Sequence, residues 1–288
     1  MPSRYNGPVP IQLIAMDLDG TLLDGQSQLP AANARAIEEA ARRGIEIVIV
    51  TGRRYHSARA IAGELACAAQ LIVSNGALIK TAAGETHYRK LLPAETARQV
   101  LVGSAEFRSC AGVIFDRPFA KQIVFERVDW GGPFVGAYLR SHRQHVAEIN
   151  PLTACLDEDD PVEILFLDDC ERINRAKRVL EALPLVKEFT LALTEYPRRN
   201  LSMLDVLARG VNKGVALAEL TRLRGIPRAN VMAIGDNWND REMLEYAGLP
   251  VVMGNSVPEL KTFGWSVTLS NEQAGVAAAI DEHVFRIA

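Results

Sequence analysis

Two aspartates one residue apart, Asp17 and Asp19, directly follow an apolar run that ends at Met16. Positions i and i+2 of a strand share a face, so both carboxylates leave on one side if the strand geometry continues. Carboxylates this close repel each other unless a cation or a proton intervenes, and oxygen ligands suit a hard cation such as Mg²⁺. One carboxylate could attack an electrophile while the other moves a proton. A polar Asp-Gly turn at a strand end would give the same residues.

Three further polar groups occupy comparable places. Thr51 ends a second apolar run, Lys213 begins a predicted helix, and Asp236, Asn239 and Asp240 follow a third run. Each group alone has an ordinary explanation, since acids at a helix start cap it and suit its dipole. Together, acids, an amine and a hydroxyl fit a Mg²⁺-bound phosphate ester: the metal neutralises the carboxylates, and the lysine and threonine hold phosphoryl oxygens.

Apolar strands separated by helices must position these groups. Strands are predicted at 11–16, 45–50, 71–74, 231–234, 249–253 and 266–269, and helices at 30–43, 55–66, 213–224 and 240–247. Unbroken apolar strands alternating with helices predict a parallel sheet covered on both faces. Ligands bind beyond the carboxyl ends of such strands, where the polar groups stand.

The middle of the chain has a different pattern. Residues 112–116 and 122–128 resemble a hairpin, helices are predicted at 94–107, 134–148 and 171–183, and further strands at 162–167, 189–193 and 201–206. Paired strands beside helices predict a separate α+β module. We therefore expect an α/β fold, with a Rossmann-like parallel-sheet core at residues 1–81 and 208–288 and an inserted module at residues 82–207.

The composition of the chain argues against a nucleic-acid-binding, membrane-spanning or secreted protein. The 288 residues are 48% hydrophobic with a net charge of -3, which gives no general attraction to nucleic acid or to an anionic membrane. The polar first ten residues lack the apolar core of a secretory signal, and the longest apolar runs are too short to cross a bilayer. The four cysteines form no paired motif, which favours free thiols in a reducing compartment. We expect a cytoplasmic protein without nucleic-acid or membrane partners.

The four polar groups resemble, in order, the four motifs of the haloacid dehalogenase (HAD) superfamily. The matching residues are Asp17-Leu18-Asp19-Gly20-Thr21, Thr51-Gly52-Arg53, Lys213, and Gly235-Asp236-Asn237-Trp238-Asn239-Asp240. Ser74-Asn75-Gly76-Ala77 and Val252-Met253-Gly254-Asn255-Ser256 are similar to signatures of the Cof-type branch (type IIB). In that branch a large α/β cap lies between the second and third motifs, where the inserted module stands. The resemblance covers essentially the whole chain, although the cap matches only in position and size.

The resemblance implies a phosphohydrolase that uses Mg²⁺. Asp17 would be the nucleophile and form a transient aspartyl-phosphate, while Asp19 would protonate the leaving oxygen and later activate water. The metal would be held by the Asp17 side chain, the Asp19 backbone carbonyl and Asp236. The implied phosphate-binding residues are Thr51, Gly52, Asn75, Lys213 and Asn239, with Asp240 as a supporting residue and Thr51 and Lys213 also counted among the catalytic groups.

The expected substrate is a small phosphorylated metabolite, with sugar phosphates as the favoured class. A cap would select the substrate through its own side chains and exclude water. A phosphotransferase or phosphomutase of the same fold is the first alternative, and a non-catalytic metabolite-binding protein is the second. A dehalogenase is disfavoured because Asp19 supplies the proton that a phosphate leaving group needs. The sequence indicates neither the particular ester nor the oligomeric state.

Overall fold

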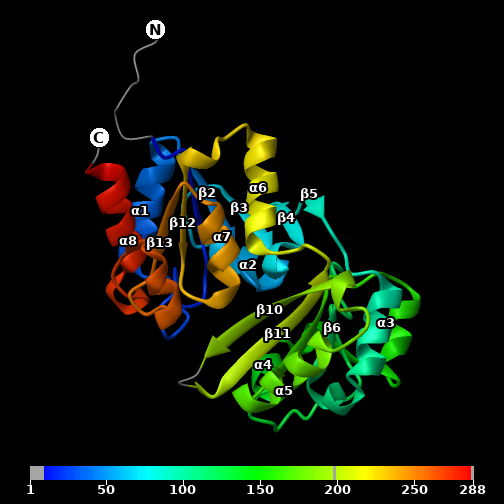
Figure 1. Ribbon diagram of the computed structural model, residues 1–288. Helices are drawn as coiled ribbons and strands as arrows, with labels where there is room; N and C mark the ends of the chain where they lie inside the picture. Colours follow the sequence, from blue (N-terminus) through cyan, green and yellow to red (C-terminus); the bar gives the residue numbers. More distant parts are fainter. Residues whose placement is uncertain (1–9, 197–198, 287–288) are drawn as a thin grey trace. The chain divides into compact units, whose positions relative to one another are not determined.

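The chain divides into two compact units in the computed structural model, which describes residues 10–196 and 199–286 (Figure 1). One unit combines the chain up to Tyr88 with the chain from Lys213 onward, and the other is Arg89–Asn212. Both divisions fall a few residues beyond the expected ones. The first does so because a strand at Thr86–Arg89 completes the sheet of the discontinuous unit.

The discontinuous unit, called the core unit below, contains an eight-stranded sheet in the order β14-β13-β12-β1-β2-β3-β4-β5. Its strands are β1 (Leu13–Met16), β2 (Glu46–Val50), β3 (Ala69–Val73), β4 (Leu78–Thr81), β5 (Thr86–Arg89), β12 (Val231–Gly235), β13 (Leu249–Val252) and β14 (Ser266–Val267). From β14 to β3 all neighbours run parallel, which confirms the predicted parallel sheet. The antiparallel partner β4 was not predicted from the sequence.

Helices cover this sheet on both faces. They are α1 (Ala31–Arg42), α2 (Tyr55–Ala62), α6 (Lys213–Arg224), α7 (Arg241–Tyr246) and α8 (Gly275–Ile280). Leu13 and Ala15 of β1 belong to one apolar cluster with residues of α6 and α7. Ile14 and Met16, which point to the other face, are also fully buried, and α1 and α8 pack against each other. Within the described residues, no helix combines the length and apolar character needed to cross a bilayer.

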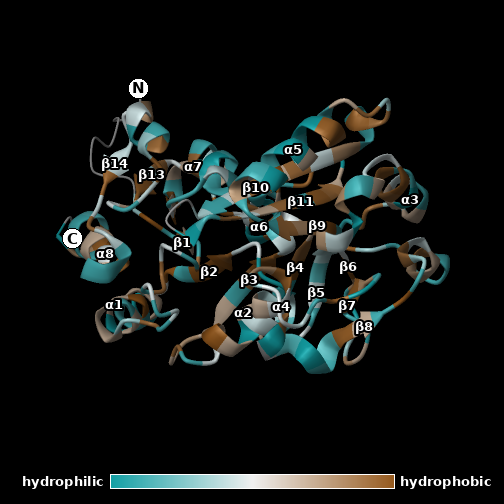
Figure 2. Ribbon diagram, turned by 90° about the horizontal axis from the view of Figure 1, so that it is seen from below, coloured by the Kyte–Doolittle hydropathy of each residue, from teal (hydrophilic) through white to brown (hydrophobic). Residues whose placement is uncertain are grey.

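The second unit, called the cap unit below, is the predicted α+β module. Its six-stranded sheet has the order β10-β11-β9-β6-β7-β8. The strands are β6 (Ala111–Ile114), β7 (Ile123–Phe125), β8 (Val146–Glu148), β9 (Glu163–Asp168), β10 (Phe189–Tyr196) and β11 (Leu201–Ala208), and the helices are α3 (Ala94–Gly103), α4 (Val135–Leu139) and α5 (Cys170–Glu181). Figure 2 colours much of β9 and β11 brown, as expected for central strands whose side chains form an apolar core.

One predicted helix of the cap unit is wrong. Residues 134–148 were expected to be a single helix, but α4 ends at Leu139, a 3₁₀ segment follows at Arg140–His145, and Val146–Glu148 forms β8. The last segment pairs in parallel with β7, which starts more than twenty residues earlier. A helix would forgo these inter-strand hydrogen bonds, so the distant partner decides the local conformation.

Candidate active site

Neighbouring strands carry three predicted site residues to the same edge of the core sheet. Asp17 follows β1, Thr51 follows β2 and Asp236 follows β12. Strand β1 lies between the other two and runs parallel to both. Backbone hydrogen bonds extend past the strand ends, with the Asp17 N–H donating to the Ile234 carbonyl at 3.1 Å. The carboxyl ends of the strands therefore hold these side chains together, as the sequence predicted.

Lys213, the first residue of α6, reaches two of the acids. Its Nζ donates to Oδ1 of Asp17 at 2.7 Å and to Oδ1 of Asp240 at 2.6 Å. The lysine side chain is 1% exposed, and those of Asp17 and Asp240 are 8% and 0% exposed. Residues nearly two hundred positions apart thus form a buried ion-pair network in which one ammonium group faces two carboxylates.

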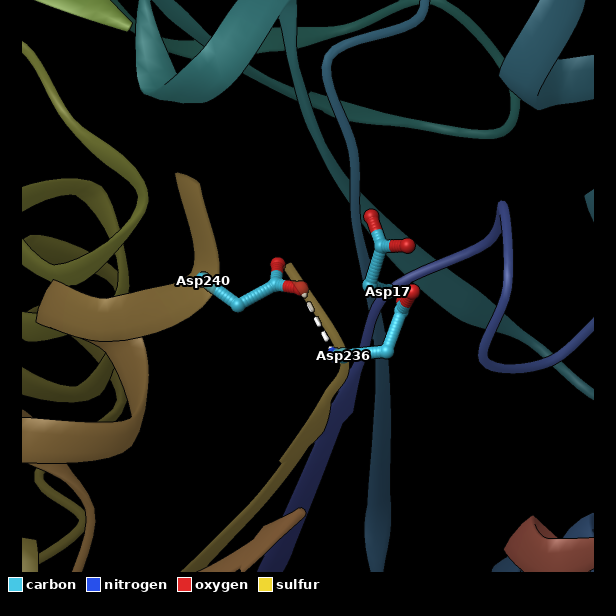
Figure 3. A group of neighbouring side chains, drawn as sticks. All are labelled: Asp17, Asp236 and Asp240. Carbon is cyan, nitrogen blue, oxygen red and sulfur yellow. Dashed lines mark hydrogen bonds between the residues drawn. The ribbon is translucent and has the colours of Figure 1, made fainter. Parts of the chain in front are cut away.

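Asp240 holds the loop that carries Asp236. Its Oδ2 accepts the N–H groups of Asp236 at 2.9 Å and of Asn237 at 3.0 Å, so both carboxylate oxygens are engaged (Figure 3). Thr21 donates its hydroxyl to Oδ1 of Asp236 at 2.8 Å and is fully buried. In the sequence, Thr21 stood out only as the last residue of the Asp17-Leu18-Asp19-Gly20-Thr21 motif, without a role of its own.

The buried carboxylates of this cluster are unfavourable in their charged form unless a further cation is bound. Burial raises the pKa of Asp17 to about 7, with Asp240 and Asp19 adding to the effect and Lys213 opposing it. Burial, together with Asp240 and Asp17, also raises the pKa of Asp236 well above its usual range. Burial works against the charged form of Lys213, but the two carboxylates outweigh it and raise its pKa. A divalent ion would let all these carboxylates ionise.

The donor set fits such an ion. Asp17, Asp236 and Asp240 each offer a carboxylate oxygen, and the three oxygens lie within 4.8 Å of one another. Figure 3 shows the Asp17 and Asp236 carboxylates side by side. Each of these two keeps one oxygen outside the hydrogen bonds described above, whereas Asp240 keeps none. Asp17 and Asp236 therefore each have an oxygen available to a hard cation.

The backbone conformation and the close packing after Asp19 require a glycine at position 20. Its φ is +87°, and a Cβ there would overlap Oδ2 of Asp236. The loop after β1 therefore packs directly on the Asp236 side chain, and only glycine leaves room for this contact.

The Asp19 carboxylate lies outside the acidic cluster and pairs with Arg53. The Nε and Nη2 atoms of Arg53 donate to the two oxygens of Asp19 at 2.7 and 2.5 Å. In the sequence, Arg53 stood out only as part of the Thr51-Gly52-Arg53 motif, without a role of its own. A basic residue directly after a predicted phosphate-binding pair was the available signal. The contact predicted between the Asp19 backbone carbonyl and a metal stays a prediction.

The predicted phosphate-binding residues other than Lys213 form a second connected group. The Thr51 hydroxyl accepts the Arg53 N–H at 3.1 Å, and the Thr51 carbonyl accepts the Asn75 N–H at 3.1 Å. Asn239 donates to Oδ1 of Asn75 at 2.9 Å. A Cβ on Gly52 would lie 3.1 Å from that same Oδ1. Asn75 thus joins the residues after β2 to the loop after β12.

The second Cof-type signature contacts the loop that follows Asp17. Asn255 donates to the Gly20 carbonyl at 2.8 Å and accepts the Asn271 N–H at 2.9 Å. Asn271 in turn donates to the Leu23 carbonyl at 3.0 Å. These two asparagines fasten the loop that follows Asp17 to the C-terminal part of the core unit.

Comparison with known proteins gives a consistent result. The family model described as haloacid dehalogenase-like hydrolase matches residues 14–280. The 5-amino-6-(5-phospho-D-ribitylamino)uracil phosphatase YcsE of Bacillus subtilis (strain 168) is 32% identical, over 94% of this chain and 95% of its own. Phosphatase YwpJ of the same organism is 29% identical, over 93% and 98%.

A solved structure supports the same fold. A haloacid dehalogenase-like hydrolase from Bacteroides thetaiotaomicron aligns with a TM-score of 0.78 and 24% identity, covering 94% of this chain and 99% of that one. The resemblance to the haloacid dehalogenase superfamily and the α/β fold are thereby confirmed. The chain belongs to the haloacid dehalogenase-like hydrolases, and it is therefore an enzyme of the hydrolase class.

Proposed function

We propose that this hydrolase is a Mg²⁺-dependent phosphatase that acts on small phosphorylated metabolites through an aspartyl-phosphate. The observation that carries the proposal is the buried pair of Asp17 and Lys213, with Nζ 2.7 Å from Oδ1, beside Asp236. A carboxylate attacks a phosphate dianion only when the repulsion between them is screened. An ammonium group and a cation site next to one buried carboxylate supply that screening.

Each proposed step assigns a task to a residue of this chain. An oxygen of Asp17 forms a bond to phosphorus while the ester O–P bond breaks, and Asp19 gives a proton to the leaving oxygen. Water then attacks the phosphorus, Asp19 takes a proton from it, and the bond to Asp17 breaks to release phosphate. Lys213 holds Asp17 and a phosphoryl oxygen. Mg²⁺, held by Asp17, Asp236 and the Asp19 carbonyl, would supply charge neutralisation.

The remaining predicted residues have supporting tasks. The Thr51 hydroxyl already accepts an N–H, so its own hydrogen can be donated to a phosphoryl oxygen. Gly52 has no side chain to obstruct the phosphoryl group, and Asn75 and Asn239 border it through their mutual hydrogen bond. Asp240 keeps Lys213 and the Asp236 backbone in place.

We further propose sugar phosphates as the substrate class and the cap unit as the part that selects among them. The relative YcsE supports this class, because its name specifies a phosphate on a D-ribityl chain. The proposed location is the cytoplasm, supported by Cys67, Cys110, Cys155 and Cys170, all of which are free thiols.

The test is phosphate release from a panel of sugar phosphates and p-nitrophenyl phosphate, with Mg²⁺ and with EDTA. The wild type is compared with Asp17→Asn, which keeps the size of the side chain but removes the charge. Asp24→Asn is the matched control, because Asp24 lies in the same loop and caps a local turn through the N–H groups of Gln26 and Gln28. We expect turnover that needs Mg²⁺, disappears in Asp17→Asn and persists in Asp24→Asn. Turnover that survives in Asp17→Asn would refute the nucleophile assignment, and transfer to a sugar acceptor without phosphate release would indicate a phosphotransferase.

A further inference from the structure

The ion pair between Arg53 and Asp19 has a geometry that fixes a carboxylate. The two hydrogen bonds run from different nitrogens of one guanidinium to different oxygens of one carboxylate, at 2.7 and 2.5 Å. This parallel arrangement determines the plane of the carboxylate as well as its distance. The side chains of Arg53 and Asp19 are 25% and 30% exposed, so the pair lies at the margin of the buried acidic cluster.

The backbone of Arg53 is held by the predicted phosphate-binding residues. Its N–H donates to the Thr51 hydroxyl at 3.1 Å, and its carbonyl accepts the Ser74 N–H at 3.0 Å. Ser74 has a left-handed backbone with φ of +48°, an uncommon conformation for a residue other than glycine. The backbone of Arg53 is thus held by hydrogen bonds at both its N–H and its carbonyl. The guanidinium therefore extends to Asp19 from a fixed backbone position.

A fixed orientation is useful to a carboxylate that must point at a particular atom. In the part of the chain that the structure describes, Arg53 supplies the hydrogen bonds that the Asp19 side chain accepts. Asp17 and Asp240 are instead oriented by Lys213. The two aspartates of the Asp-Leu-Asp run are therefore positioned by different cations, one in the segment between β2 and α2 and the other at the start of α6.

We propose that Arg53 is a positioning residue that sets the orientation of the Asp19 carboxylate for its two proton transfers. This inference rests on the proposed function, in which Asp19 protonates the leaving oxygen and later accepts a proton from water. Proton transfer by a placed side chain contributes roughly 10²–10⁴-fold to rate. A misplacement of about 1 Å already costs about 10²-fold. Loss of Arg53 should therefore act through Asp19 and leave phosphate binding largely intact.

The first experiment compares kcat/KM for two esters in the wild type and in Arg53→Ala. One ester is the sugar phosphate that the wild type hydrolyses best, whose alkoxide leaving group needs a proton. The other is p-nitrophenyl phosphate, whose leaving group departs without one. We expect a loss of roughly 10²-fold on the sugar phosphate, with a smaller loss on p-nitrophenyl phosphate and little change in KM. Equal losses on both esters with a raised KM would overturn the proposal and make Arg53 a phosphate-binding residue.

A double-mutant cycle gives a second readout. In an Asp19→Asn background, Arg53→Ala should cost no further activity on the sugar phosphate, because its effect passes through Asp19. Arg53→Lys should recover only part of the activity, since an ammonium group cannot form the parallel pair. A loss in the Asp19→Asn background as large as in the wild type would contradict the proposal.

The controls separate this inference from the proposed function. Arg59→Ala, the same change at an exposed position of α2, should leave both esters unaffected. Arg53→Gln keeps much of the side chain and replaces Arg53→Ala if that variant unfolds. If the wild type releases no phosphate from either ester, or if Asp17→Asn stays active, the proposed function fails, whatever the Arg53 variants do.

Discussion

Removing the metal should make the stability of this enzyme fall as the pH rises. The carboxyl of Asp17 has its pKa raised from 3.8 to about 7, chiefly by burial. Between these values the folded protein keeps a proton that the unfolded chain has released. Because the folded state binds more protons than the unfolded state in this range, raising the pH favours the unfolded state. The free energy of unfolding therefore decreases until the pH passes about 7.

The size of the effect follows from that difference. From about pH 5 to pH 7 one such group lowers the free energy of unfolding by about 3 kcal/mol, at about 1.4 kcal/mol per pH unit. At roughly 2–4 °C per kcal/mol, this corresponds to a fall in Tm of roughly 6–12 °C. Asp236, whose pKa is also raised by burial, adds to the fall in the same direction.

Thermal unfolding in EDTA from about pH 5 to about pH 8 measures this effect, with Asp17→Asn as the matched variant. The asparagine has no proton to lose, so the Tm of the variant should fall less and overtake that of the wild type as the pH rises. Saturating Mg²⁺ should flatten the wild-type curve, because the cation favours the ionised carboxylate. Parallel curves for the two proteins in EDTA would refute the reasoning, since Asp17 would then not be the group that resists ionisation.

Three other substitutions give separate tests. Lys213→Met should lower the free energy of unfolding in EDTA by about 3–5 kcal/mol, because it leaves two buried carboxylates without their cation, and an unchanged unfolding curve would contradict the ion-pair network. Gly20→Ala should weaken Mg²⁺ binding measured by calorimetry, since the new Cβ would overlap Oδ2 of Asp236, and wild-type affinity would show that this contact is unimportant. Asn75→Ala should be less stable than Asn75→Gly by about 1 kcal/mol, because φ at this position is +50°, and equal chemical denaturation curves would argue against that cost.

The positions of Asp17, Thr51 and Asp236 at one edge of the sheet could be predicted from the sequence because their causes are local. Apolar strands end directly before Asp17, Thr51 and Asp236, and parallel strands place their carboxyl ends at one edge. Lys213 could be included among the predicted site residues because it begins a helix whose boundaries are clear in the sequence. That its Nζ lies 2.7 Å from Oδ1 of Asp17 and 2.6 Å from Oδ1 of Asp240 depends on tertiary packing and is seen only in the structure.

The features that the sequence did not indicate depend on partners far away in the chain. Nothing near Arg53 shows that its guanidinium faces Asp19 rather than solvent or a phosphate. Thr21 looks like a turn residue until β12 brings Asp236 beside it. Likewise, Val146–Glu148 has no strand signal of its own and becomes β8 through its pairing with β7.

The central claim, that Asp17 is phosphorylated during turnover, can be tested by trapping the intermediate. The enzyme is mixed with Mg²⁺ and its best ester, quenched during turnover and treated with borohydride, which reduces an aspartyl-phosphate to homoserine. Peptide mass mapping should find this conversion at Asp17 in the wild type, only when the ester is present, and never in Asp17→Asn. Steady phosphate release with an unmodified Asp17, or with the modification on another residue, would contradict the account.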